Sequence, residues 1–441
     1  MSLLVEQPAL KTQGVSNLDE PSFCESITDL VLVASASRSG STFFMELMKR
    51  SNMFWLCQGE FNHLLHESKL TWPHRPSDRL NKEDYFSADP RALAKIGTGL
   101  KAELGELAPE LTEKVWQDYK CRLDKRMSLQ WHTEQFGQIV SVAAESALSE
   151  CRSQDGWKPS EFRSPRRFFC RFLQVIRREF NIVSPFYYDI PPELIAEFFP
   201  GCLLPIKAPS GLAAEQTPFI IPSPWQGVTD ENLRSRICMI DTPSNCYRLE
   251  FLRELFPNAR LRIIHLVRNA AASINGLVDG WLHHGFHAFP VGELKIEGYS
   301  NASVHGKEWW KFDLPPNWER YKKKSLLEVA AFQWVSAQTS ILEFVRKHPG
   351  IDSIQLRYED LAWDQHRRGQ MLSRLGTWLD GKSNLLNGLS YQRIPDVMAT
   401  TAPKKDRWLT HPKRSRQILD YASTDSELVN VNQELGYQFF D

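Results

Sequence analysis

A cation, a glycine and several hydroxyl side chains lie together near the start of the chain, in residues 31–44, VLVASASRSGSTFF. Arg38 precedes Gly40, and Ser41 and Thr42 follow it where helix-forming sequence begins. The first turn of a helix presents unpaired backbone N–H groups and the positive end of the helix dipole, and a glycine lets a bound group approach the backbone closely. These residues therefore predict a site for an anion, with phosphate as the first candidate.

The order of residues in this loop differs from that of the P-loop that hydrolyses ATP or GTP. That loop ends in Gly-Lys-Ser/Thr, so its lysine follows the glycine. Here Ser41 follows Gly40, and the cation, Arg38, precedes the glycine. We therefore do not expect a magnesium-dependent P-loop NTPase, and a kinase-like P-loop enzyme is kept only as an alternative function.

Two further segments have the same strand-to-helix pattern, IIHLVRNAAASINGL at residues 263–277 and LRYEDL at 356–361. In the first of them Arg268 stands at the junction between the apolar run and the helix. Because the carboxyl ends of parallel strands meet at one edge of a sheet, where α/β proteins bind ligands, we expect Arg38 and Arg268 to lie at the same edge.

Together these three segments resemble the sulfotransferases that use 3′-phosphoadenosine-5′-phosphosulfate (PAPS) as the sulfonyl donor. In that family a strand, a loop of the form Arg/Lys-Ser-Gly-Thr/Ser-Thr and a helix bind the 5′-phosphosulfate, and the matching residues are Arg38, Ser39, Gly40, Ser41 and Thr42. A second strand that ends in Val-Arg-Asp/Asn-Pro binds the 3′-phosphate, and it is matched by Val267, Arg268 and Asn269. The resemblance covers about residues 30–60 and 200–380. It implies PAPS as co-substrate and no metal, because arginines and helix dipoles neutralise the charge.

The second junction departs from the family pattern at two positions. The proline expected after Asn269 is replaced by Ala270, and the serine that the family carries further along the helix is replaced by Gly276. Ser273 or Asn275, in the next turns of the same helix, is the candidate replacement as a ligand of the 3′-phosphate.

A third departure concerns a cation near the sulfonyl group. Related carbohydrate and tyrosine sulfotransferases tend to carry a lysine where this chain has Asp241. Lys207, in the segment PIKAPS after another apolar run, is the available catalytic substitute. The alternative interpretation of Lys207 is a lysine at the end of a strand without a catalytic role.

Glu60 is the candidate general base. Transfer of a sulfonyl group to a hydroxyl needs a base, because the hydroxyl loses its proton as the new bond forms. The segment LCQGEFNHL resembles the turn that carries a catalytic Glu in many carbohydrate and tyrosine sulfotransferases, and we expect Glu60 in that role. The resemblance is thus closer to the carbohydrate, tyrosine and bacterial type than to the cytosolic small-molecule type. His63 and His66 are alternatives, since cytosolic small-molecule members use His, and a helix-capping carboxylate is the structural interpretation of Glu60.

A basic segment, TAPKKDRWLTHPKR at residues 401–414, resembles in position and character the loop that closes over the nucleotide in this family. We expect Lys404, Arg407 and Trp408 to contact the nucleotide and the segment to exclude water from the donor. A solvated basic loop is the alternative.

Composition limits the classes of partner. In 441 residues Lys and Arg number 53, equal to Asp and Glu, so no overall basic field favours nucleic acid. The eight cysteines are scattered, as is typical of reduced thiols in the cytoplasm. The chain has no secretory signal pattern, and no apolar run is long enough to insert in a membrane. We expect a soluble cytoplasmic protein.

Apolar runs bounded by turns alternate with helical patterns, which predicts an α/β fold with a mostly parallel central sheet between helices, similar to a P-loop fold. The predicted strands span residues 31–37, 54–58, 203–208, 237–241, 261–267 and 354–357. We expect a loose leader at 1–27 and one domain at 28–441 with a mainly helical insertion at about 70–200. In that insertion a helix is predicted whose apolar stripe consists of Phe168, Phe169, Phe172 and Ile176.

The sequence thus predicts a PAPS-dependent sulfotransferase that acts on a small-molecule alcohol or phenol. Arg38 would stabilise the departing phosphate and Glu60 would accept the proton. The alternative from another class is a catalytically impaired nucleotide-binding regulatory protein of the same fold, in which Gly276 and Asp241 mark lost activity.

Overall fold

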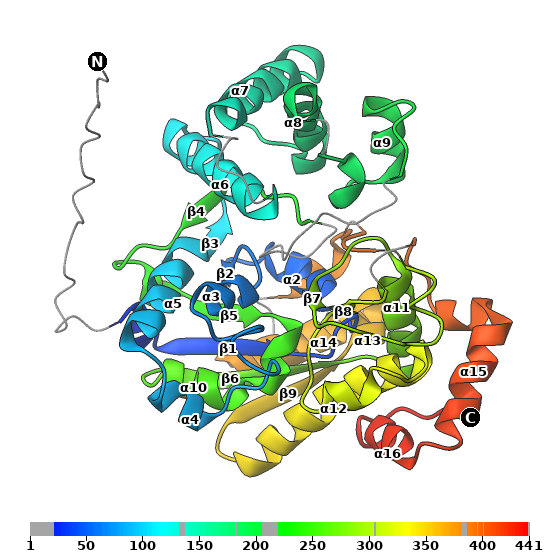
Figure 1. The fold of residues 1–441 in the computed structure, drawn as a ribbon. Helices are drawn as coiled ribbons and strands as arrows, with labels where there is room; N and C mark the ends of the chain where they lie inside the picture. The colour runs from blue at the N-terminus through cyan, green and yellow to red at the C-terminus, as the bar shows by residue number, and fades with distance from the viewer. Residues whose placement is uncertain are drawn as a thin grey trace, which may run out of the picture.

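The computed structural model describes residues 22–131, 137–180, 183–204, 219–303, 306–380, 386–394, 396–399 and 401–439. Within these ranges the chain forms a seven-stranded sheet in the order β4-β3-β2-β5-β1-β6-β9, with helices on both faces (Figure 1). This arrangement confirms the predicted α/β class. None of the described helices is both long and apolar enough to cross a membrane.

Five neighbouring strands of the sheet are parallel. In spatial order they are β2 (Phe54–Cys57), β5 (Ile237–Asp241), β1 (Asp29–Ala34), β6 (Arg260–Val267) and β9 (Asp352–Arg357). Near-continuous apolar runs produce this arrangement, because both faces of such a sheet are covered. Five of the six predicted strands are confirmed with small shifts at their ends, and the sixth, residues 203–208, falls largely outside the described residues.

Two short antiparallel strands, β3 (Leu104–Leu107) and β4 (Trp225–Gly227), extend the sheet beyond β2 and were not predicted. β3 follows a helix without an intervening turn, so no turn residue marks its start. Gly105 allows β4 to come close, because a Cβ atom there would lie 2.2 Å from the carbonyl oxygen of Gln226.

Helices cover the two faces of the sheet unequally. On one face Val31 and Val33 of β1 pack with α2 (Ser41–Met48) and α14 (Gln365–Asp380). On the other face Leu30 and Leu32 belong to a larger core with α5 (Pro90–Glu103), α10 (Leu249–Leu255), α11 (Ala270–Leu282) and α12 (Leu326–Lys347). The smaller helices around this core are α1 (Phe23–Ser26), α3 (Asn62–Glu67), α4 (Lys82–Phe86), α15 (Pro412–Ala422) and α16 (Ser426–Glu434). The short helix α13 (Tyr358–Ala362) packs on the first face, with α2 and α14.

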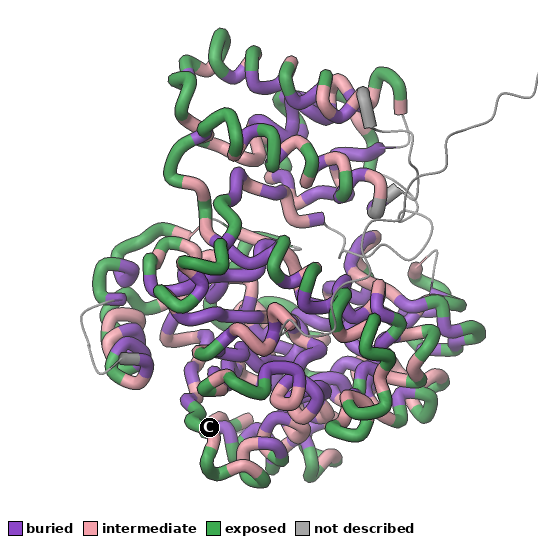
Figure 2. The backbone as a smooth tube through the Cα atoms, turned by 90° about the vertical axis from the view of Figure 1, so that its left-hand side faces the viewer, coloured by how far each residue is buried: buried purple, intermediate pink, exposed green. Residues whose placement is uncertain are grey.

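A helical subdomain stands above the β3–β4 side of the sheet (Figures 1 and 2). It consists of α6 (Glu113–Trp131), α7 (Gly137–Gln154), α8 (Pro165–Glu179) and α9 (Pro192–Phe198), and it has its own apolar core. The four residues of the predicted apolar stripe in α8 are all buried in that core. Arg166, Arg167 and Arg171 of α8 pair with carboxylates inside the subdomain, for example Arg171 with Asp155 at 3.1 Å, which favours a structural role for these three residues.

The predicted insertion, about residues 70–200, also contains α4, α5 and β3, which pack with the main core through residues such as Leu80, Ile96 and Leu100. Of the predicted leader at 1–27, residues 1–21 lie outside the described ranges. The remainder includes α1, whose Cys24 is fully buried.

Candidate functional site

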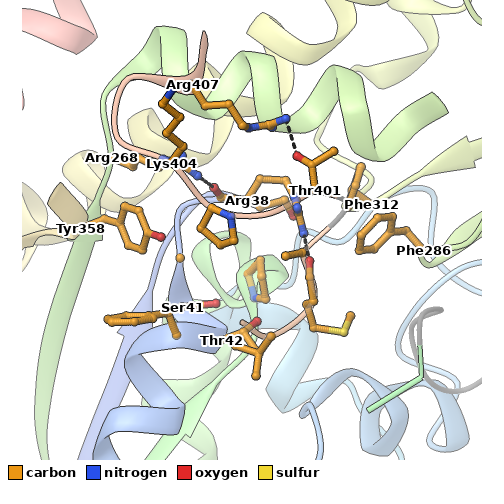
Figure 3. A pocket seen from close by; sticks show the side chains of 18 of the residues that line it. Arg38, Ser41, Thr42, Arg268, Phe286, Phe312, Tyr358, Thr401, Lys404 and Arg407 are labelled. Carbon is orange, nitrogen blue, oxygen red and sulfur yellow. Dashed lines mark hydrogen bonds between the residues drawn. The ribbon is translucent and has the colours of Figure 1, made fainter. Parts of the chain in front are cut away.

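A cavity of ≈ 120 Å³ lies at the carboxyl edge of the sheet, between the loops after β1 and β6 and the segment at 396–407 (Figure 3). Four basic side chains line it, one from each loop and two from the C-terminal segment: Arg38, Arg268, Lys404 and Arg407. The sequence placed these four residues at one site, and the structure brings them together. The other labelled residues around the cavity are Ser41, Thr42, Phe286, Phe312, Tyr358 and Thr401.

The loop after β1 is shaped by Gly40, which forms the N-cap of α2 with φ +94°. A Cβ atom on this residue would lie 2.2 Å from the ring of Tyr358, so only glycine fits both the turn and its neighbour. α2 begins at Ser41, and its first backbone N–H groups therefore face the loop. Ser41 and Thr42 line the cavity, while Ser39 is fully buried.

The guanidinium of Arg38 is enclosed but only partly bonded. Its Nη1 donates to the carbonyl oxygen of Met398 at 2.9 Å, and its Cζ lies 4.9 Å from the centre of the Phe286 ring. Its Nε is buried and has no hydrogen-bond partner among the described residues. Burial, followed by the charges of Arg268 and Arg407, lowers the pKa of Arg38 to about 10. The group stays charged at neutral pH, so it favours an anion in the cavity.

Arg268, at the end of β6, connects the second junction to the first. Its Nη1 donates to the backbone carbonyl oxygen of Arg38 at 3.0 Å, and its Cζ lies 4.8 Å from the centre of the Tyr358 ring. Arg268 also lines the cavity. Arg268 thus supports the Arg38 loop and contributes charge to the same site.

The N-terminus of α11 is bonded internally, unlike that of α2. The backbone N–H of Asn269 donates to Glu359 at 3.0 Å, and that of Ala270 donates to Asn432 at 3.2 Å. Tyr437 in turn donates to Glu359 at 2.7 Å. An anion at this junction therefore depends on the side chain of Arg268 more than on the backbone of the helix.

The two candidate replacements for the missing serine lie away from the cavity surface. Ser273 is fully buried and its Oγ has no partner among the described residues, and Asn275 is buried and accepts a hydrogen bond from Arg414 at 3.1 Å. Gly276 is the residue of α11 that faces Arg38, because a Cβ atom on it would lie 3.5 Å from the Cβ of Arg38. The side chain of Arg38 therefore packs beside α11 at Gly276, where the family carries its serine.

The C-terminal segment is attached to α11 through Asp279. Nη2 of Arg407 donates to Asp279 at 2.6 Å, its Nη1 donates to Thr401 at 2.7 Å, and Arg414 also pairs with Asp279. The segment therefore lies over the Arg38 loop (Figure 3). Trp408, which was expected to contact the nucleotide, packs against the main core and is not among the described residues that line the cavity.

Glu60 follows β2 and is the one carboxylate among the described residues that line this cavity. Its turn is held by the backbone N–H of Phe61, which donates to Thr242 at 2.7 Å. His63 and His66, the two alternatives, are not among the described residues that line the cavity; Nδ1 of His63 contacts the carbonyl oxygen of Glu60, and Nδ1 of His66 contacts Thr71. The geometry therefore favours Glu60 over either histidine as the base.

The helical subdomain contributes charge next to this turn. Glu103 pairs with Arg122 at 2.8 Å and with Arg126 at 3.9 Å, and Nη2 of Arg126 lies 3.4 Å from where a Cβ on Gly59 would be. Burial opposes ionisation of Glu103, but Arg126 and Arg122 outweigh it and hold its pKa below the usual range. Sequence reasoning missed this cluster, because nothing in the spacing of α6 indicates which core residue its arginines meet.

Asp241 lies at the end of β5, beside the loop. The residue is half-buried, it accepts a hydrogen bond from Ser41, and its Oδ1 is buried with no partner among the described residues. Burial raises the pKa of Asp241 to about 7. Lys207, its proposed counterpart, lies outside the described residues.

No protein-family model and no curated protein matches the chain. Two solved structures are similar to it. The sulfotransferase domain from the curacin biosynthetic pathway is 15% identical, with a TM-score of 0.36 over 93% of this chain and 99% of that one. The sulfotransferase domain from the Synechococcus PCC 7002 olefin synthase is 10% identical, with a TM-score of 0.32 over 97% of this chain and 99% of that one.

Replacing Gly40 by alanine tests the close approach to Tyr358. The left-handed backbone costs a residue with a Cβ about 1–2 kcal/mol, and the collision with the ring adds roughly 1–3 kcal/mol. We expect urea denaturation followed by circular dichroism to show that Gly40→Ala lowers the free energy of unfolding by the sum of these two contributions. Gly156→Ala is the matched control, because Gly156 has φ +65° and nothing within 4 Å of the added Cβ, so it shows only the first loss. Equal losses in the two variants would contradict the close approach.

Asp241→Asn tests the buried carboxyl through pH. The folded state, with a pKa of about 7, keeps a proton that the unfolded state releases at about pH 4. The contribution of this group to stability therefore falls as pH rises between those values, by up to about 1.4 kcal/mol per pH unit. In urea titrations we expect the variant to gain stability relative to wild type as pH increases across this window. The exposed Asp420→Asn is the control. If the difference in free energy of unfolding between Asp241→Asn and wild type does not vary with pH, the raised pKa of Asp241 is contradicted.

Proposed function

We propose that the chain is a PAPS-dependent sulfotransferase, which transfers a sulfonyl group from PAPS to an acceptor hydroxyl and releases adenosine 3′,5′-bisphosphate. The observation that carries this proposal is the convergence of two strand ends on one cavity, where Arg268 bonds to the backbone of Arg38 at 3.0 Å. A ligand with phosphate groups at two ends of an adenosine suits two cationic junctions on one sheet edge. The absence of a lysine after Gly40 disfavours the kinase-like alternative.

Each end of the donor has candidate ligands. Arg38 pairs with the 5′-phosphate and neutralises the charge that builds on the oxygen between phosphorus and sulfur, while Ser41 and Thr42 donate from the start of α2. Arg268 binds the 3′-phosphate, with Lys404 and Arg407 beside it. The enclosed setting strengthens these interactions, because the surrounding dielectric is lower than that of water.

Glu60 acts as the general base. The acceptor oxygen attacks sulfur as its proton passes to Glu60, and the bond from sulfur to the bridging oxygen breaks, so the electron pair remains on the phosphate. Support comes from the position of Glu60 as the carboxylate on the wall of the cavity that also contains Arg38.

The acceptor is a small alcohol or phenol. Phe286 and Phe312 form an apolar wall beside Arg38, with ring centres 5.3 Å apart, and such a wall suits a hydroxyl carried on an apolar or aromatic group. We place the reaction in the cytoplasm, which fits eight cysteines that are all free thiols.

The C-terminal segment has to move for the donor to bind. Binding sites for small molecules usually measure about 300–1,000 Å³, and the cavity measures only ≈ 120 Å³. Met398 occupies one donor of Arg38, and Thr401 and Asp279 occupy Arg407. The incoming phosphates replace these carbonyl, hydroxyl and carboxylate partners.

Adenosine 3′,5′-bisphosphate should stabilise the protein in a thermal-shift titration. At about a hundred times its dissociation constant a ligand adds roughly 2.7 kcal/mol. We expect ATP with Mg²⁺ to give a much smaller shift, and Arg268→Ala to lose the response. Arg260→Ala, an exposed arginine at the other end of β6, is the control and should keep it. No shift with the bisphosphate, or a larger shift with ATP and Mg²⁺, would overturn the proposed function.

Glu60→Gln should separate an enzyme from a binding protein. Loss of a general base lowers turnover by about 10²- to 10⁴-fold, and we expect the affinity for adenosine 3′,5′-bisphosphate to stay unchanged. The measurement is bisphosphate release from PAPS with a panel of small alcohols and phenols. A wild-type protein that binds the bisphosphate but turns over none of the panel would favour the regulatory alternative. If Glu60→Gln retains turnover, a residue other than Glu60 is the general base.

A further inference from the structure

Two phenylalanines beside Arg38 have backbone conformations that bulky residues rarely adopt. Phe286 has φ +74° and Phe312 has φ +63°, and both line the cavity (Figure 3). Left-handed backbone at a bulky residue persists only where the surrounding structure holds it. The ring of Phe286 lies over the Arg38 guanidinium, with 4.9 Å between Cζ and the ring centre. The residues that hold the Phe286 ring in place therefore also affect the position of the Arg38 guanidinium.

Lys311 holds the segment that carries Phe286. It lies at the end of β8 (Trp309–Lys311), which pairs with β7 (Ala288–Pro290), so its partner strand begins just after the loop at 283–287. The residue is only 4% exposed. Its Nζ donates to three backbone carbonyl oxygens, those of Gly280 at 3.4 Å, Gly285 at 2.7 Å and His283. A single side chain thus joins the last turn of α11 to the loop.

The amine suits this role chemically. An ammonium group has three N–H donors, which equals the number of carbonyl oxygens around it. The carboxyl end of α11 favours a positive charge, and no ion pair among the described residues includes Lys311. Burial opposes this charge and lowers the pKa of Lys311 to about 7, whereas the three carbonyl oxygens around Nζ favour the ammonium form. Burial also lowers the pKa of His283 to about 3, so that imidazole is neutral. The N–H donors of Nζ are therefore used for hydrogen bonds to the end of α11 and the loop that follows it.

Contacts on the other side of Lys311 fix Phe312. Nε2 of Gln333 donates to the carbonyl oxygens of Lys311 and Asp313, each at 2.9 Å, on either side of Phe312. Gly280 leaves room for the Phe312 ring, because a Cβ there would lie 2.3 Å from its Cζ. The Phe312 ring supports the Phe286 ring, so the lysine and the aromatic pair form one connected unit.

We propose that Lys311 is a positioning residue of the anion site: by holding the carbonyl oxygens of Gly280, His283 and Gly285, it keeps Phe286 over the guanidinium of Arg38. A guanidinium held in place before the ligand binds loses less freedom on binding, which strengthens the interaction. Its consequence for catalysis rests on the proposed function, whereas its effect on the loop does not.

The test compares Lys311→Met, which keeps the length of the side chain without its donors, with Lys307→Met, an exposed lysine of the same segment. Hydrogen exchange followed by mass spectrometry should show amides at 280–288 exchanging about tenfold or more faster in Lys311→Met, and unchanged in Lys307→Met. Unchanged exchange in Lys311→Met would overturn the proposal. Lys311→Gln, which keeps an amide donor, replaces Lys311→Met if the latter does not fold.

Ligand affinity tests the connection to Arg38. We expect the dissociation constants of adenosine 3′,5′-bisphosphate and of inorganic pyrophosphate to rise about tenfold in Lys311→Met, with rescue to near wild-type values in Lys311→Arg. Because Lys311 acts through Phe286, Lys311→Met combined with Phe286→Leu should be no weaker than the weaker single variant. Additive losses would mean that Lys311 does not act through the ring, and would overturn the proposal.

The two ligands separate the failures. If wild type binds pyrophosphate with a dependence on Lys311 but does not bind the bisphosphate, the proposed function fails and the positioning role stands. If both ligands bind equally well to wild type and Lys311→Met, the positioning role fails and the proposed function stands.

Discussion

The turn between β1 and α2 requires positive φ angles at Arg38 and Gly40, and the rest of the site is arranged around it. This turn reverses the chain within a few residues, so the N-terminus of α2 and the Arg38 guanidinium both reach the cavity. The carbonyl oxygen of Arg38 accepts from Arg268, and Tyr358 fills the space that Gly40 leaves open. The ends of β1, β6 and β9 are thereby joined through one turn.

Charge at the site is concentrated and only partly balanced. Arg38, Arg268, Lys404 and Arg407 surround a small enclosed space, and the mutual repulsion contributes to the lowered pKa of Arg38. Asp279 neutralises part of this charge, but it pairs with Arg414 as well as Arg407. A bound anion relieves the repulsion that remains, which is why an excess of cations over carboxylates around a cavity favours a phosphate-bearing ligand.

The sequence was sufficient to predict structural features that depend on residues close together in the chain. Strand-to-helix junctions at Arg38 and Arg268 follow from local patterns, and so does their meeting at one sheet edge. Contacts between distant segments were not predictable: Asn432 accepts a hydrogen bond from the backbone N–H of Ala270 across 162 residues, at a position where the resemblance expected a proline, which has no N–H. The left-handed conformation of Phe286 was equally hidden, because the type of residue does not indicate it and the contact from Lys311 to the neighbouring Gly285 spans 26 residues.

One backbone segment connects the cavity to the helical subdomain. Met398 accepts from Arg38 through its carbonyl oxygen, and its N–H donates to Asp189 of the subdomain at 3.2 Å. Arg166 of α8 bonds both to Asp189 and to the carbonyl oxygen of Asp396, each at 2.6 Å. The backbone of Met398 therefore links the guanidinium of Arg38 to the carboxylate of Asp189. Because hydrogen bonds with a charged partner are stronger than those between neutral groups, the contacts of Asp189 and Arg166 hold the backbone at 396–398 firmly to the subdomain.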